Sequence, residues 1–88
     1  MAKVIPIEGK EYETKDLSLE NMQKIVGGYI EIITLKDHKT SMVLNEEGKI
    51  TDPPLPLNPR ANKLAAGSLF EGDYIAGNVI VCQPGELK

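Results

Sequence analysis

Residues 29–45, YIEIITLKDHKTSMVLN, carry the pattern that decides the fold. Residues 29–36 are rich in β-branched side chains, residues 36–40 (KDHKT) are polar, and residues 41–45 (SMVLN) are apolar again, which is typical of a β-hairpin. The first strand of this hairpin has large side chains on both faces, with Ile30 and Ile32 on one face and Tyr29, Ile33 and Leu35 on the other. We therefore expect this strand to be central in its sheet or covered on both faces.

The segment after the hairpin predicts a turn, a short strand and a helix. Residues 45–48 (NEEG) suit a turn, because Asn45 is favoured at the first position and Gly48 can take a positive φ. Residues 49–51 (KIT) favour a short strand. In residues 57–67 (LNPRANKLAAG), Asn58 is an N-cap candidate, Pro59 fits the first helical position and Gly67 fits the position after the helix. A helix this short must dock through its apolar face.

Three further elements flank this region. Residues 19–26 predict a helix, because Ser18 is a good N-cap, apolar residues recur at helical spacing and Gly27-Gly28 ends the pattern. Residues 3–7 (KVIPI) favour an edge strand, since Pro6 cannot donate to a ladder. Residues 73–83 (DYIAGNVIVCQ) predict a long strand that Gly77 interrupts, which indicates a bulge or a close backbone approach.

Together these elements predict an α+β domain in the order β-α-β-β-β-α-β. Its mostly antiparallel sheet has four to five strands, and its two helices are short. The 88 residues predict one domain spanning 1–88, with its core in 17–82 and a frayed tail at 83–88. Because one cysteine cannot form an intrachain disulfide and the core is thin, we expect a homo-oligomer.

Composition excludes several classes of function. The formal net charge is −3 and the lysines are scattered along the chain, whereas a nucleic-acid polymer requires clustered basic residues. No stretch approaches the roughly 18 apolar residues of a membrane span. No positively charged leader precedes an apolar run. We therefore expect a cytoplasmic protein that binds neither nucleic-acid polymers nor membranes.

The sequence offers little support for catalysis. His38 lies on a polar loop between two lysines, and Cys82 lies in an apolar strand, so we interpret them as a solvated side chain and a core residue. Glu46 and Glu47 are neighbours in a turn, where both cannot easily point into one site. No phosphate loop, nucleophile elbow or calcium-loop spacing is present. We predict no catalytic residues, no metal and no cofactor; a hydrolase using Glu46, Glu47 and His38 is the weakest alternative.

Arg60, the only arginine, is the most informative single residue. It occupies the second position of the predicted short helix, where it adds positive charge to the positive end of the helix dipole. This placement is tolerable if Arg60 meets an anion, and Asn58 and Asn62 add amide donors beside it. Two interpretations remain open. Arg60 forms a salt bridge to Glu46, Glu47 or Asp73, or it binds a ligand.

Four ordered blocks resemble a known family. They are residues 26–35 (VGGYIEIITL), 43–50 (VLNEEGKI), 55–64 (LPLNPRANKL) and 72–81 (GDYIAGNVIV). They are similar to an uncharacterised small domain family of bacteriophages, plasmids and related bacteria, over residues 26–81. The resemblance implies a small accessory protein of a phage or mobile element. It transfers no catalytic residues, and the doubled Pro53-Pro54 and the Pro-Arg pair depart from the family pattern.

Our leading hypothesis is a non-enzymatic protein that sequesters a small anionic ligand, such as a nucleotide-type immune signal. Asn58, Arg60 and Asn62 would bind the anion, beside the turn that contains Asn45 and Glu47, and Tyr29 or Tyr74 would stack on a base. The alternative is an interaction module that inhibits a host defence protein. That module would use the strand edge near Pro6 and the proline-rich segment 53–57.

Overall fold

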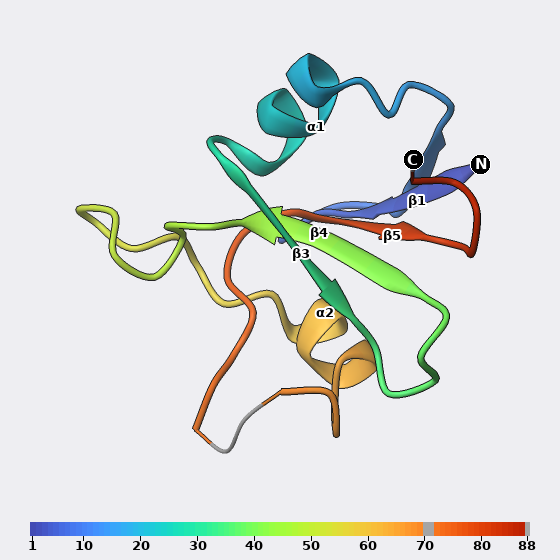
Figure 1. Cartoon of the computed structure of the whole chain (residues 1–88). Coiled ribbons are helices and arrows are strands. Elements are labelled where there is room, and N and C mark those ends of the chain that lie inside the picture. The colour runs from blue at the N-terminus through green and yellow to red at the C-terminus, as the bar shows by residue number, and fades with distance from the viewer. Residues whose placement is uncertain (70–71, 88) are drawn as a thin grey trace.

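The computed structural model describes residues 1–69 and 72–87. It contains the strands β1 (Ala2–Ile5), β2 (Tyr12–Thr14), β3 (Ile30–Thr34), β4 (Ser41–Asn45) and β5 (Val79–Cys82), and the helices α1 (Leu19–Val26) and α2 (Pro59–Leu64). The strands form one antiparallel sheet in the order β2-β1-β5-β4-β3. In Figure 1, α1 lies above the sheet and α2 lies below it. The predicted α+β class, with an antiparallel sheet and two short helices, is confirmed.

The sheet is buried on both faces at its centre. Every residue of β5 is buried, as are four of the five residues of β4. One apolar cluster lies between the sheet and α1, and it includes Val43, Ile80 and Cys82. A second cluster lies between the sheet and α2. It includes Met42, Val79 and Val81 of the sheet, Ala61 of α2 and Ala65 of the turn after it. Continuous apolar runs in both strands are the sequence signature of a sheet covered on two sides. The core is therefore two thin layers.

The hairpin of β3 and β4 forms as predicted, with Ile32 opposite Val43. Of the two alternatives predicted for β3, the central position is wrong, because β3 is an edge strand, and the coverage on both faces is found in part. Other residues cover β3 only in part. Ile30 packs against the cluster between the sheet and α1, and Ile33 packs against the cluster between the sheet and α2, but Ile32 is 50% exposed. Periodicity reveals that both faces are apolar, but it does not reveal which strand lies beside which.

The N-terminal strand is also placed differently from the prediction. β1 is not an edge strand, because it pairs with β2 on one side and with β5 on the other. Pro6 does not interrupt these ladders, since the last paired residue is Ile5. The edge of the sheet on this side is formed by β2. This three-residue strand was not predicted from the sequence, because its residues are mostly polar.

Of the predicted strands, the one at residues 49–51 is absent and the one at residues 73–83 is shorter than expected. The turn at 45–48 forms, but Gly48 does not take a positive φ. Residues 49–51 form no strand, because the amides of Ile50 and Thr51 both donate to the Glu47 carbonyl in a continuing turn. In residues 73–83 only β5 is a strand; Ala76 makes a single bridge to Leu57.

Both predicted helices form. Ser18 caps α1 and accepts from the Asn21 amide, while Gly27 ends the helix in the left-handed conformation. α2 begins at Pro59 as predicted but ends at Leu64, and Gly67 takes its positive φ in the turn that follows. No helix in the described part of the chain is long and apolar enough to cross a membrane.

The C-terminal segment, predicted to be frayed, makes defined contacts over residues 83–87. The Glu86 carboxylate accepts from the Gln83 amide at 2.7 Å and lies 3.4 Å from the N-terminal ammonium. These contacts lower the Glu86 pKa, with the Gln83 hydrogen bond as the largest cause. Leu87 packs against the cluster beneath α1. Lys88 lies outside the described residues.

Gly77 provides a test of the close backbone approach. Its φ is +84°, and a Cβ built there would lie 2.8 Å from Leu55 Cδ1. We expect Gly77→Ala to destabilise the protein by about 2–4 kcal/mol, from the left-handed backbone and the overpacking together. The matched control is Gly9→Ala, with a φ of +88° but no neighbour within 4 Å, for which we expect only about 1–2 kcal/mol. Urea unfolding measures both, and equal losses would contradict the close approach.

Candidate functional site

An open groove of about 710 Å³ lies between α2 and the face of the sheet that α2 covers. We call it the α2 groove. Ile5, Leu35, Leu64 and Val81 supply its apolar surface. Its rim carries charged side chains from β1, the segment before β2, the turn between β3 and β4, and α2: Lys3, Glu11, Lys36, Asp37, Arg60 and Lys63. An apolar surface with a few convergent polar groups is the usual form of a small-molecule site.

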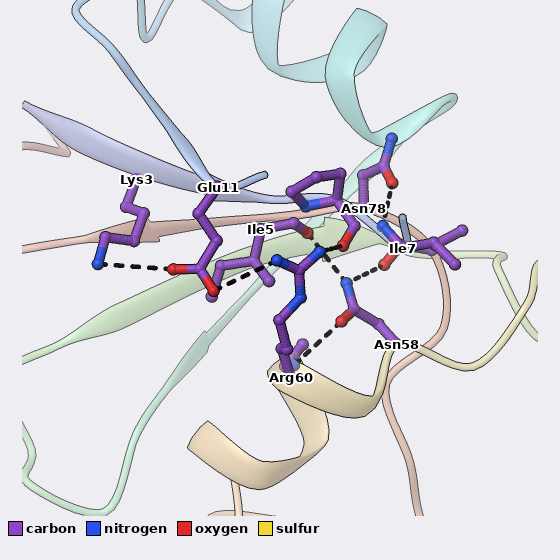
Figure 2. Close-up of polar contacts among 10 residues, drawn as sticks. Lys3, Ile5, Ile7, Glu11, Asn58, Arg60 and Asn78 are labelled. Atoms are coloured by element: carbon purple, nitrogen blue, oxygen red, sulfur yellow. Dashed lines mark hydrogen bonds and ion pairs between the residues drawn. The ribbon is translucent and has the colours of Figure 1, made fainter. Parts of the chain in front are cut away.

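Arg60 reaches from α2 across to the N-terminal strand. Its Nη2 donates to the Pro6 carbonyl at 2.6 Å, and its Nη1 lies 3.5 Å from Glu11 Oε2 (Figure 2). The other oxygen of Glu11 lies 3.6 Å from Lys3 Nζ. The salt bridge that the sequence suggested therefore exists, but its partner is Glu11 and not Glu46, Glu47 or Asp73. Asp73 pairs with Lys49 instead.

The two acidic side chains of the groove are both engaged. Glu11 faces Lys3 and Arg60. Asp37 accepts hydrogen bonds from the hydroxyl and the amide of Thr40 and from the Lys39 amide, and these contacts lower its pKa to about 2. The Asp37 carboxylate is thus ionised at neutral pH and its oxygens belong to its own turn.

Two cations of the rim have no acidic partner among the described residues. Neither Lys36 nor Lys63 forms an ion pair within residues 1–69 and 72–87. With four basic and two acidic side chains, the α2 groove is locally positive although the chain carries a net charge of −3. Such a site raises the local concentration of anions.

Asn58 does not offer its amide to a ligand, contrary to the prediction. The side chain is fully buried, and its Oδ1 caps α2 by accepting from the Ala61 amide at 3.1 Å. Its Nδ2 donates to the carbonyls of Ile5 at 3.0 Å and Gly77 at 2.9 Å (Figure 2). Both donor hydrogens of this amide, and one of the two acceptor positions of its oxygen, are used within the fold.

Asn62 is likewise structural. Its Nδ2 donates to the carbonyls of Asn58 and Ile75, and its Oδ1 accepts from the Ile75 amide at 2.8 Å. The start of α2 offers few backbone donors, since Pro59 has no N–H and the Ala61 amide donates to the Asn58 side chain. Of the three residues predicted at this helix end, only Arg60 lines the groove.

The other four predicted residues lie elsewhere. Tyr29, Asn45 and Glu47 line a second hollow of about 310 Å³ beside the end of α1, where Asn45 is buried and bonded to the Val26 carbonyl. Tyr74 lines a third, much smaller hollow, with Lys49 Nζ 5.0 Å from its ring centre. Neither hollow shares a lining residue with the α2 groove. The structure therefore does not bring the seven predicted residues together: Arg60 lines the α2 groove, four others line the two smaller hollows, and Asn58 and Asn62 line none of the three.

Lys3, Glu11, Lys36 and Lys63 are site residues that sequence reasoning missed. Helical spacing could have identified Lys63, because it lies three positions after Arg60 and therefore on a neighbouring part of the helix surface. Strand alternation could have identified Lys3, which shares a face with Ile5. Nothing local marks Glu11 or Lys36, since their partners come from distant segments.

The residues considered for catalysis are dispersed. Glu46 and Glu47 line different hollows, and His38 is exposed in the turn between β3 and β4 with a φ of 60°. Cys82 is buried, which raises the pKa of its thiol. Among the described residues, no group of three or more His, Cys, Asp or Glu side chains could hold a metal ion. The absence of catalysis stays a prediction.

The fold defines the chain as a small α+β domain, with one five-stranded antiparallel sheet between two short helices. The family model described as "Domain of unknown function (DUF3846)" matches residues 1–87, so the chain belongs to this family. The resemblance seen in residues 26–81 is confirmed at that level, while the phage and plasmid distribution stays a prediction. No curated protein and no solved structure matches the chain significantly.

The structural role of Asn58 can be tested by truncation. We expect Asn58→Ala to lower the free energy of unfolding by about 3–5 kcal/mol, because it removes the helix cap and leaves two buried carbonyls without a donor. Asn21→Ala removes one exposed hydrogen bond, to the Asp16 carbonyl, and we expect a loss of about 1 kcal/mol. Chemical denaturation compares the two variants. A loss below about 1 kcal/mol for Asn58→Ala would show that its amide is dispensable for the fold.

Proposed function

We propose that this protein binds and sequesters a small anionic ligand in the α2 groove. The observation that carries the proposal is the set of four basic side chains around an apolar surface, two of them without an acidic partner in the described chain. The apolar surface would cover the uncharged part of the ligand, and the cations would pair with its anionic groups.

The basic side chains lie towards both ends of α2. Arg60 stands on its first turn, and the Lys36 stem lies beside Gly67 in the turn after the helix, since a Cβ at Gly67 would lie 3.3 Å from Lys36 Cδ. Six helical residues span about 9 Å. A ligand with anionic groups at two separated positions, such as a dinucleotide, could reach both sets of cations.

The ligand class follows from this charge pattern and from the expected context. A phage or plasmid accessory protein in the host cytoplasm would meet nucleotide-type signals of host defence, so these are the first ligands to test. The described residues that line the groove include no aromatic side chain. A base would therefore rest on aliphatic groups such as Leu64, and not on Tyr29 or Tyr74 as the sequence suggested.

The proposal is tested with Lys36→Ala/Lys63→Ala against a panel of mononucleotides, cyclic dinucleotides and dicarboxylates. We expect at least one ligand to raise the melting temperature of the wild type, and the double variant to bind it at least tenfold more weakly, because two charge-assisted contacts are lost. Lys15→Ala/Lys24→Ala, on α1 and the segment before it, is the control with the same change in net charge.

Native mass spectrometry of the freshly purified protein reports a retained ligand and the number of subunits together. The expected homo-oligomer is tested by the same measurement. No binding to the panel, or equal binding by both double variants, would contradict the proposed groove.

A second candidate function is an interaction module that inhibits a host protein. One observation favours it: β3 is an edge strand, and Tyr29 and Ile32 along it are 67% and 50% exposed. A partner could add a strand to this edge. The edge near Pro6, which the sequence suggested, is not available, since β1 is paired on both sides.

Ile32→Lys tests this alternative, because a lysine on an exposed edge opposes strand addition. We expect a stoichiometric host partner captured by the wild type to be lost from this variant, while Lys36→Ala/Lys63→Ala keeps it. The control is Ile50→Lys, which makes the same change at a side chain that is 76% exposed in the turn after β4. Retention of the partner by Ile32→Lys would exclude the β3 edge.

A further inference from the structure

The Glu11 carboxylate lies between two cations of the α2 groove, but it is held loosely. It lies 3.6 Å from Lys3 Nζ and 3.5 Å from Arg60 Nη1, which are ion-pair distances beyond those of a good charge-assisted hydrogen bond. Its side chain is 35% exposed. Such pairs contribute little to stability, so the carboxylate can be exchanged for another anion.

Arg60 does not depend on Glu11 for its position, and Lys3 has a fixed backbone. The Arg60 guanidinium is anchored by its other terminal nitrogen, which donates to the Pro6 carbonyl at 2.6 Å (Figure 2). Lys3 extends from β1, whose backbone is fixed by ladders on both sides. If Glu11 turned away, the Arg60 guanidinium would remain directed at the position that it had left, and the flexible Lys3 side chain would remain within reach of it. Donors already in place reduce the free-energy cost of binding.

Glu11 itself is placed to leave. It precedes β2, whose first paired residue is Tyr12, so its side chain can rotate without breaking the ladder. A terminal phosphate group at the same position would carry more charge than a carboxylate and present three acceptor oxygens to the two cations. The exchange therefore favours phosphate over carboxylate ligands.

We propose that a phosphate group of the ligand replaces the Glu11 carboxylate between Lys3 and Arg60. Glu11 thus acts as an internal competitor that sets the affinity of the groove. This inference rests on the proposed function, because it assigns one subsite of the same groove and names its ligand chemistry. It adds that the unliganded protein masks this subsite with its own carboxylate.

The test uses Glu11→Gln, which keeps the shape of the side chain and removes its charge. Inorganic pyrophosphate and the tightest ligand of the nucleotide panel are titrated by isothermal calorimetry at fixed ionic strength. We expect both to bind Glu11→Gln about two- to fivefold more tightly than wild type, the range that loss of an exposed ion pair corresponds to. Glu20→Gln, in the first turn of α1, makes the same charge change away from the groove and should leave the affinity unchanged.

Nuclear magnetic resonance locates the event. Arg60 is the only arginine, so its Nε–H gives one side-chain signal of that type. We expect this signal to shift when pyrophosphate is added, and to reach its bound position at a lower concentration in Glu11→Gln.

The outcomes separate the two proposals. If the wild type binds the panel ligand but Glu11→Gln binds it no more tightly, the exchange is wrong and the proposed function stands. A bound ligand that leaves the Arg60 signal unmoved likewise overturns the phosphate subsite alone. If neither protein binds any probe, both proposals fail.

Discussion

The rest of the structure depends on the buried amide of Asn58. This side chain begins α2, and it also joins the end of β1 and the Gly77 turn before β5 by donating to their carbonyls. A helix of six residues is not stable alone in water, so α2 exists because it is anchored at this point and packs through Ala61. The groove between α2 and the sheet is a consequence of that anchor.

The proline-rich segment before α2 serves the same purpose. Leu55 packs close to Gly48 and Gly77, and Leu57 bridges Ala76, so residues 55–57 bind the segment before β5 without forming a regular strand. Proline restricts the backbone of the unfolded chain, which lowers the entropy lost when this segment is fixed. The segment thus holds Asn58 within hydrogen-bonding distance of Ile5, Gly77 and Ala61.

Local signals predicted most of the elements, and distant pairings explain the failures. As helix caps, Ser18, Gly27 and Asn58 act on neighbours within a few residues, so the helix starts and the end of α1 could be predicted from the sequence. The edge of the sheet could not, because it depends on whether β1 pairs with β5 from the other end of the chain. The residues around Arg60 were not predicted for the same reason. The sequence shows that Arg60 is unusually placed in its helix, but it does not show that the partner of Arg60 is Glu11.

The division of polar groups in the fold explains why charge, and not amide donors, marks the groove. Among the described residues, no buried side-chain nitrogen or oxygen lacks a hydrogen-bond partner. The asparagines that seemed suited to binding are used up in this way, because a buried amide without partners would cost more than the fold can tolerate. The lysine side chains on the rim do not need hydrogen-bond partners within the protein, because water solvates them. Among the described residues of the α2 groove, the cations without an ion pair are Lys36 and Lys63. They lie beside Lys3 and Arg60, whose two positive charges the single Glu11 carboxylate offsets only in part.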